Sequence, residues 1–251
     1  MKSIHKKKIL ILVATLFVFI LAGIYALIYK PIFAEASGDD SICQKNIYLE
    51  EAEYVSIPSN TNTSCNVYAF ADAIIGIDYD EQLGVDFVAL WRITNDGIVM
   101  RGNLGGFTLP MLEALQSISH TKKFIMQDVP GSYDDEALSP AIMRVRDLGY
   151  DTFVPSDGII SSGGVDFFAG GVNREAHQNA RVGVHSWAEG FDEGGKTAKD
   201  YPKNAKEHAL FLKLYKYLEI PEDFYWFTIN QAPADVMYWM TPAEVKKYLL
   251  S

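Results

Sequence analysis

The sequence predicts an α/β fold, in which a parallel sheet alternates with helices, placed after an apolar N-terminal segment. Between residues 86 and 187, stretches with strand-like alternation take turns with stretches whose apolar residues recur every three or four positions. Strand, helix, strand, helix, strand is the order of a parallel sheet with right-handed crossovers. The hydrophobic share of 49% in 251 residues provides for one sizeable core.

The N-terminal segment is an uncharged run from Ile9 to Tyr29, which is long enough to span a bilayer. It is either a membrane helix or a long signal peptide, and Ala34 and Ala36 stand where a signal peptidase needs small residues. The run exceeds the usual core of a signal peptide, about 7 to 15 residues, which favours an uncleaved anchor. Lysines at positions 6 to 8 keep the N-terminus in the cytoplasm, so we expect the remainder to be extracytoplasmic, in the periplasm or at the cell surface.

The charge of the chain argues against a nucleic-acid partner. Residues 1–30 hold five of the 22 basic residues and none of the 32 acidic ones. The rest of the chain therefore carries 17 basic against 32 acidic residues, a formal charge near −15. Phosphate binding needs a basic surface, so a nucleic acid is not expected to bind. The expected partner is the membrane, through the N-terminal helix.

Cys43 and Cys65 are the only cysteines of the sequence. Thiols outside the cytoplasm tend to be oxidised, so these two are predicted to form a disulfide, the alternative being two free buried thiols. With five scattered histidines they give no zinc or iron spacing, and we expect neither a metal nor a cofactor. The predicted organisation is a cytoplasmic stub and anchor at 1–30, a spacer with the cysteine pair at 31–66, and the α/β domain at 67–251.

The elements of the α/β domain are predicted in order along the chain. Residues 86–93 ("DFVALWRI") and 97–104 ("GIVMRGNL") are two neighbouring strands. Residues 109–118 have the apolar spacing of a helix, and 122–129 ("KKFIMQDV") are again strand-like. A Pro-Gly-Ser turn at 130–132 then interrupts the pattern.

A second helix follows this turn, capped by Asp134 or Asp135 and ended by Gly149. Its apolar positions are Leu138, Ile142, Val145 and Leu148. Residues 151–158 are predicted as a short strand and turn, and 162–171 as a third helix.

The last third of the chain is predicted to return once to the sheet and then to end in helices. Residues 173–180 are a connector and 180–187 a further strand. Residues 204–220 are an amphipathic helix, and Thr241 with Glu244 matches the capping box that starts a terminal helix.

Two adjacent serines followed by two glycines, in "GIISSGG" at 158–164, are the first sign of chemistry. A serine hydroxyl becomes a nucleophile when a base takes its proton, and the oxyanion that follows needs preorganised donors. At the start of a helix, Ser162 would stand beside unpaired N–H groups and the positive end of the helix dipole. Gly163 presents no Cβ to a substrate. The residues alone leave Ser161 as an equal candidate, and leave open that Ser162 only caps the helix.

The partners of such a serine are predicted at the same edge of the sheet. His185 ends the strand-like segment 180–187, and the backbone N–H of Gly131 follows an earlier strand. The carboxyl ends of parallel strands are where sites form in open sheets. On the residues alone, His185 can equally be a buried histidine bonded to a backbone carbonyl.

The serine segment resembles the motif of the Clp protease proteolytic subunit: a glycine, three residues, the nucleophile, one residue and a glycine. On this sequence the motif implies Ser162 as the nucleophile. "VPGS" is similar to the family's Pro-Gly-Gly oxyanion motif, which implies Gly131 and Gly163 as oxyanion-hole donors. "VGVHSW" is similar to the segment that carries the family's histidine, which implies His185 as the general base.

The third member of the family's triad is an aspartate shortly before a Met-Ser/Thr-x-x-Glu segment. "ADVMYWMTPAEVKKYLL" resembles this segment and implies Asp235, across a gap longer than in the peptidase. On the residues alone, Asp235 can equally cap a turn after Pro233. The resemblance covers roughly Gly97 to Leu250 and implies a Clp/crotonase-like ββα superhelix behind a transmembrane helix, as in exported Clp-like proteins.

The function implied by this resemblance is that of a serine hydrolase, above all a peptidase with a peptide or protein substrate. The "SSGG" motif is also similar to that of membrane-anchored signal peptide peptidases, which use a serine and a lysine. In that case Lys196 or Lys199 would be the base. A catalytically inactive module that binds an envelope protein is a second alternative. A crotonase-like acyl-CoA enzyme is disfavoured by export and by the lack of a basic patch for the CoA phosphates.

Two departures from the family pattern limit what carries over. Ser132 stands where the oxyanion motif has its second glycine, and its side chain would narrow the pocket. The insertion at 188–204 has no counterpart in the compartmental peptidase, so its barrel-like assembly is not expected here, although a homo-oligomer of another kind is compatible with the sequence.

Overall fold

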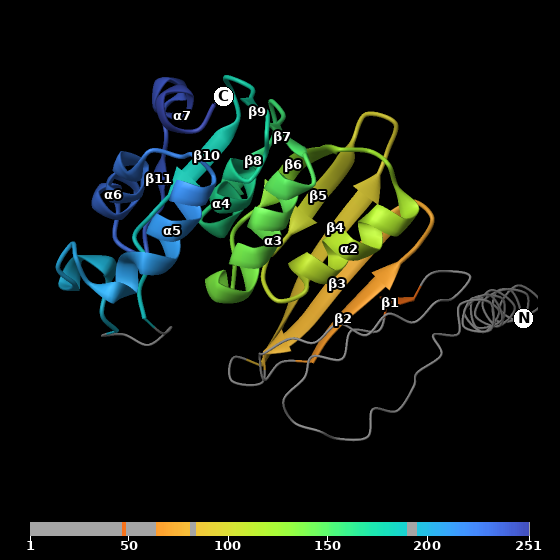
Figure 1. Ribbon diagram of the computed structural model, residues 1–251, viewed down its shortest axis with the longest axis horizontal. Coiled ribbons are helices and arrows are strands. Elements are labelled where there is room, and N and C mark those ends of the chain that lie inside the picture. Colours follow the sequence, from red (N-terminus) through yellow and green to blue (C-terminus); the bar gives the residue numbers. More distant parts are fainter. Residues whose placement is uncertain (1–46, 49–63, 81–83, 190–194, 251) are drawn as a thin grey trace, which may run out of the picture. The chain divides into compact units, whose positions relative to one another are not determined.

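The described chain begins with five consecutive strands, and from β5 to β10 strands are interrupted by helices as predicted (Figure 1). The computed structural model describes residues 47–48, 64–80, 84–189 and 195–250, all within one compact unit. The strands are β1 (Ile47–Tyr48), β2 (Ser64–Ala69), β3 (Ala73–Asp80), β4 (Val85–Ile93), β5 (Ile98–Gly102), β6 (Lys123–Val129), β7 (Asp151–Val154), β8 (Ile159–Ser161), β9 (Arg174–Ala176), β10 (Arg181–Val184) and β11 (Tyr238–Trp239). The helices are α2 (Thr108–Ile118), α3 (Asp135–Asp147), α4 (Gly163–Ala169), α5 (Ala209–Tyr217), α6 (Glu222–Gln231) and α7 (Pro242–Tyr248), with 3₁₀ turns η1 (Ala198–Asp200) and η2 (Lys206–His208).

The described strands form one mixed sheet that branches at β6. The order along its main path is β1-β2-β3-β4-β5-β6-β8-β10-β11. The first half of β6 pairs with β7, which continues to β9, while its end pairs with β8, which continues to β10. All of these pairings, and that of β5 with β6, are parallel. The predicted parallel sheet is therefore confirmed from β5 to β10, and the predicted neighbouring strands 86–93 and 97–104 are confirmed as the paired β4 and β5. The strands β2 and β3, which extend this antiparallel ribbon, and the antiparallel edge strand β11 were not predicted.

The helices that follow β5 and β6 cover one face of this sheet, where α2 and α3 cross the strands in Figure 1. The predicted cap of α3 is confirmed: the carboxylate of Asp134 accepts a hydrogen bond of 2.9 Å from the N–H of Ala137. Gly149 follows the helix with a φ of 72°, the left-handed conformation that ends helices. Both ends of α3 are thus defined as predicted.

A cluster of fully buried aromatic rings anchors α4 to the sheet. Phe167 of α4 lies 5.2 Å from Phe124 of β6, ring centre to ring centre. Phe124 in turn contacts Trp91 at 5.2 Å and Tyr150 at 4.9 Å. Such rings bury large apolar areas and favour edge-to-face and offset contacts. The helix that follows the two serines therefore has a rigid support.

Three elements differ from the sequence prediction. The expected connector 173–180 contains β9, whose polar residues gain strand structure from pairing with β7 and not from any apolar alternation. The amphipathic segment 204–220 breaks into η2 and the shorter helix α5. Strand β2 begins inside the segment predicted as spacer. The capping box of α7 is confirmed, since Thr241 and Glu244 bond to each other's backbone N–H groups.

Two predictions fall outside the described residues. The apolar run 9–29 and Cys43 are not among them, and the side chain of Cys65 is not described either. Over the described ranges, no helix is both long and apolar enough to cross a membrane. The anchor and the disulfide therefore stay predictions.

Candidate active site

Ser162 sits at a strained corner between β8 and α4. Its φ of 50° and ψ of −130° lie in a region that L-residues other than glycine rarely adopt. The corner is held by backbone bonds, from the N–H of Ser162 to the carbonyl of Gly183 at 3.0 Å and from the N–H of Val165 to the carbonyl of Ser162 at 2.8 Å. A side chain kept on such backbone points to a use for that side chain, because glycine would fit there without strain.

The structure separates the roles of the two adjacent serines. Ser161 is buried, and its Oγ donates a hydrogen bond of 2.7 Å to the carbonyl of Pro130. Ser162 instead lines a cavity, and its Oγ bonds to no other described residue. Ser161 therefore positions the 130–132 turn, while Ser162 presents a free hydroxyl.

The 130–132 turn lies directly against Ser162. A Cβ built on Gly131 would stand 3.2 Å from Cβ and 3.7 Å from Oγ of Ser162. The backbone N–H of Gly131 bonds to no described residue, whereas its carbonyl accepts from the N–H of Leu104 at 2.9 Å. The next residue but one, Tyr133, donates its hydroxyl proton to the buried carboxylate of Asp78 at 2.5 Å. The turn is thus fixed on both sides, and the N–H of Gly131, next to Ser162, has no described partner.

Gly163 offers the second unused N–H, at the first position of α4, where helical N–H groups have no partner within the helix. A Cβ on Gly163 would lie 2.5 Å from Cβ of Ser132, so only glycine fits beside that side chain. Gly164 is as tightly placed, because its Cβ would come 2.4 Å from the carbonyl oxygen of Val129. Cβ of Ser132 therefore lies directly against Gly163.

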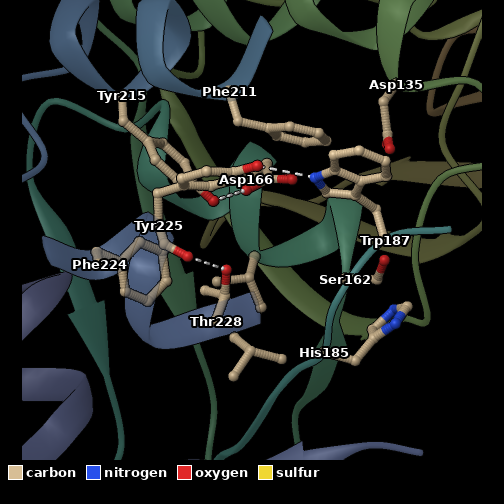
Figure 2. A pocket seen from close by; sticks show the side chains of 12 residues that line it. Asp135, Ser162, Asp166, His185, Trp187, Phe211, Tyr215, Phe224, Tyr225 and Thr228 are labelled. Carbon is tan, nitrogen blue, oxygen red and sulfur yellow. Dashed lines mark hydrogen bonds between the residues drawn. The ribbon is translucent and has the colours of Figure 1, made fainter. Parts of the chain in front are cut away.

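His185 directly follows β10 and lines the same cavity as Ser162. The two side chains lie at the same end of the pocket in Figure 2. Nδ1 of His185 is 2.9 Å from the carbonyl of Ser186, and in the tautomer that donates this proton the lone pair is on Nε2. Burial lowers the pKa of His185, outweighing the backbone carbonyls of Ser186 and Ala234, which raise it. No hydrogen bond links His185 to Ser162.

The remaining predicted site residues are not brought to this cavity. Asp235 is exposed on a turn after Pro233 and makes no hydrogen bond to His185. The backbone of its neighbour Ala234 faces the imidazole instead. Lys196 and Lys199 are exposed as well, and Lys196 lies over the ring of Tyr201. Of the residues predicted from the sequence, the cavity joins Ser162 and His185, with Gly131 and Gly163 beside them.

The cavity has a volume of about 40 Å³, and five of its twelve lining residues are Trp, Phe or Tyr. Its walls are held by a hydrogen-bonded set in which Nε1 of Trp187 donates to the hydroxyl of Tyr225 at 2.8 Å, and Nδ1 of His208 lies 2.6 Å from the same hydroxyl. The lining residues are Asp135, Ser162, Val165, Asp166, Val184, His185, Trp187, Phe211, Tyr215, Phe224, Tyr225 and Thr228.

Two acids in this cavity were missed from the sequence. Asp166, one helical turn after Ser162, is 8% exposed and accepts a hydrogen bond of 2.5 Å from the hydroxyl of Tyr215. Burial, with the charge of Asp135 second, raises the pKa of Asp166 to about 7. Burial also raises the pKa of Asp135 to about 6. The available signal was the lone acid inside the apolar helix "GGVDFFA", which indicates a carboxylate carried into the core.

The described residues contain no group of three or more His, Cys, Asp or Glu side chains placed to hold a metal ion. The arrangement around Ser162 offers other chemistry: a free hydroxyl on a strained corner, two unused N–H groups beside it and an imidazole in the same cavity. This set is suited to attack on an acyl carbon.

Comparison with known proteins adds little to this geometry. No protein-family model matches the chain, and no curated protein matches it. Among solved structures, 41 chains match its fold. One of them is a mutant of a membrane-bound stomatin-specific protease, with a TM-score of 0.44 and 16% sequence identity over 60% of this chain and 74% of that chain. So loose a likeness assigns neither a family nor a site to the present chain.

Proposed function

We propose that the chain is a membrane-anchored, extracytoplasmic serine hydrolase of the Clp/crotonase type, acting as a peptidase on peptide or protein substrates. The single observation that carries the proposal is the strained Ser162, whose hydroxyl is free and which lies against Gly131, a residue whose backbone N–H has no described partner. The branching of the sheet at β6 supports the Clp-like part, because strands β7 and β8 leave β6 in two directions as in a ββα superhelix. The anchor and the location rest on the apolar run 9–29 and the lysines before it.

In the proposed reaction, Oγ of Ser162 attacks the carbonyl carbon and its proton passes to Nε2 of His185. The carbonyl oxygen becomes an oxyanion, which the N–H groups of Gly131 and Gly163 stabilise. Collapse of this tetrahedral intermediate breaks the carbon–nitrogen bond, and His185 returns the proton to the leaving amine. Water then attacks the acyl-enzyme by the same route, which releases the carboxylic acid and restores Ser162.

The orientation of His185 has two candidate sources. The motif resemblance gives this role to Asp235, whereas the geometry favours the backbone carbonyl of Ser186, at 2.9 Å from Nδ1. Asp235→Ala distinguishes them: a loss of reactivity comparable to that of His185→Ala supports the aspartate, and near-normal reactivity supports the carbonyl.

Labelling of the full chain with a fluorophosphonate, read by intact mass, tests the proposal. Wild type is expected to take up one phosphonate, and Ser162→Ala and His185→Ala are expected to take up none. Labelling that survives in His185→Ala would move the base to a lysine, although Lys196 and Lys199 line no part of the cavity.

A protein-binding module without catalysis is the second candidate. It is favoured by the missing hydrogen bond between Ser162 and His185 and by the small cavity of about 40 Å³. Hydrolases often tighten such bonds only when substrate is bound, so labelling decides between the two. A folded wild type that takes up no phosphonate would overturn the hydrolase proposal and leave the binding module.

A further inference from the structure

The cavity beside Ser162 carries a buried carboxylate that no protein cation neutralises. Asp166 is 8% exposed, and the hydroxyl of Tyr215 occupies only one of its oxygens, Oδ1. Oδ2 has no hydrogen-bond partner among the described residues, and Asp166 lines the cavity. Figure 2 places Asp166 at the centre of the pocket. A buried carboxylate oxygen without a partner is costly unless a ligand completes it.

A second carboxylate enters the same cavity from a different helix. Asp135 is the first residue of α3, whereas Asp166 belongs to α4. Each has its pKa raised by burial, and the charge of Asp135 further raises that of Asp166. No lysine or arginine is among the residues that line the cavity. The two acids therefore share a space that lacks a positive charge.

The walls of the cavity suit a slender cation. The rings of Trp187, Phe211 and Tyr225 line it, and aromatic faces attract ammonium groups. The enclosed space of about 40 Å³ is far below the several hundred Å³ of a pocket for a whole ligand. It admits the end of one unbranched side chain, with a compact charge, more readily than a planar guanidinium.

We propose that this cavity is the specificity pocket of the enzyme and that it binds a lysine side chain of the substrate at the residue whose carbonyl Ser162 attacks. This inference rests on the proposed function. The position fits the role, because Ser162 and His185 form one end of the cavity and Asp166 lies within it. Asp166 and Asp135 receive the ammonium group, and the aromatic rings hold the aliphatic part of the chain.

The test uses two peptidyl phosphonates that differ in one side chain beside the phosphorus. One carries lysine, and the other carries norleucine, which has the same carbon chain without the ammonium group. The full chain is expected to react at least about tenfold faster with the lysine probe, because a desolvated carboxylate discriminates strongly for an ammonium. In Asp166→Asn the ratio of the two rates is expected to fall close to one.

Glu136→Gln is the matched control, since Glu136 is an exposed acid in the same first turn of α3 as Asp135 and does not line the cavity. It is expected to keep the wild-type ratio. If Asp166→Asn fails to fold, Asp135→Asn carries the test, with a smaller fall in the same ratio.

The outcomes separate this inference from the function on which it rests. Equal rates for the two probes, in a wild type that a simple fluorophosphonate labels, would overturn the lysine pocket and leave the hydrolase standing. Wild type that no phosphonate labels would overturn both.

Discussion

At the scale of single residues, the two adjacent serines carry opposite kinds of information. The hydroxyl of Ser161 donates a hydrogen bond to the carbonyl of Pro130. The hydroxyl of Ser162 makes no hydrogen bond to a described residue, and its backbone is strained. Motif spacing predicted the free one, together with His185 and Gly131. It could not predict Asp166 and Asp135, because what makes them unusual is burial in a shared cavity, which depends on how α3 and α4 pack.

Ser161→Ala and Ser162→Ala are expected to separate stability from reactivity. Ser161→Ala removes the half-buried hydrogen bond to the carbonyl of Pro130 and should lower the free energy of unfolding by about 1 kcal/mol, yet the variant should still label. Ser162→Ala breaks no hydrogen bond of its side chain and should unfold like wild type without labelling. Chemical denaturation and phosphonate labelling of both variants check this. A large loss of stability in Ser162→Ala would assign that residue a structural role instead.

The reactivity of Ser162 is expected to follow the protonation of His185. Burial lowers the pKa of this histidine below its ordinary value of 6.5, and only the neutral ring can accept a proton. The labelling rate should therefore rise with pH through a midpoint below 6.5 and then level off. Rates measured from pH 4.5 to 8 at constant ionic strength give the midpoint. A midpoint well above 6.5 would mean that another group acts as the base.

At the scale of elements, the sequence predicted the helices and strands that have a clear apolar periodicity within their own residues. Helix α3 has a cap, a regular apolar stripe and a terminal glycine, and all three occur as expected. Strand β9 could not be found in this way, because its residues "REA" become a strand only through pairing with β7. The division of the segment 204–220 into η2 and α5 was likewise not visible in its apolar pattern. The local apolar pattern is enough to identify long elements, whereas short strands such as β9 form only through pairing with another strand.

The contact between the start of α4 and the turn after β6 gives an element-level prediction. Gly163→Ala places a Cβ 2.5 Å from Cβ of Ser132 and 3.0 Å from its backbone N, so helix and turn must separate. We expect a loss of about 1–3 kcal/mol of stability, as for other overpacked sites, and a strong loss of labelling.

Removing the opposing side chain should restore part of this loss. The double variant Ser132→Gly with Gly163→Ala is expected to be more stable than the sum of the two single changes predicts, because the clash with Cβ of Ser132 is gone. Strict additivity of the two effects, measured by denaturant unfolding, would show that the turn and the helix do not contact as described.

At the scale of the whole molecule, the described unit is an acidic α/β domain joined to a segment that the sequence predicts to be a membrane anchor. Of the mixed sheet, the parallel half and the neighbouring strands β4 and β5 could be predicted. The antiparallel pairing of β2 with β3 and of β3 with β4 could not, because it depends on strand contacts that no short motif records. The Cys43–Cys65 pair, the anchor and the location stay predictions.

The topology is testable with sealed right-side-out membrane vesicles that carry the full chain. Protease added from outside is expected to digest the chain beyond residue 30, since the three lysines before the apolar run hold only the N-terminus inside. An N-terminal tag on the same chain is the internal control and should stay intact until detergent opens the vesicles. Protection of the α/β domain in intact vesicles would place it in the cytoplasm.

The branch point at β6 also bears on when activity can first arise. Gly131, Ser162 and His185 follow three different strands, β6, β8 and β10, which pair in parallel only after the intervening crossovers have formed. Parallel pairings between distant segments are slow to form, because the chain loses the entropy of loop closure before the stabilising contacts are made. No fragment or early folding intermediate can hold all three residues together. On the proposed mechanism, the nascent chain is therefore without hydrolytic capacity until β6, β8 and β10 have paired.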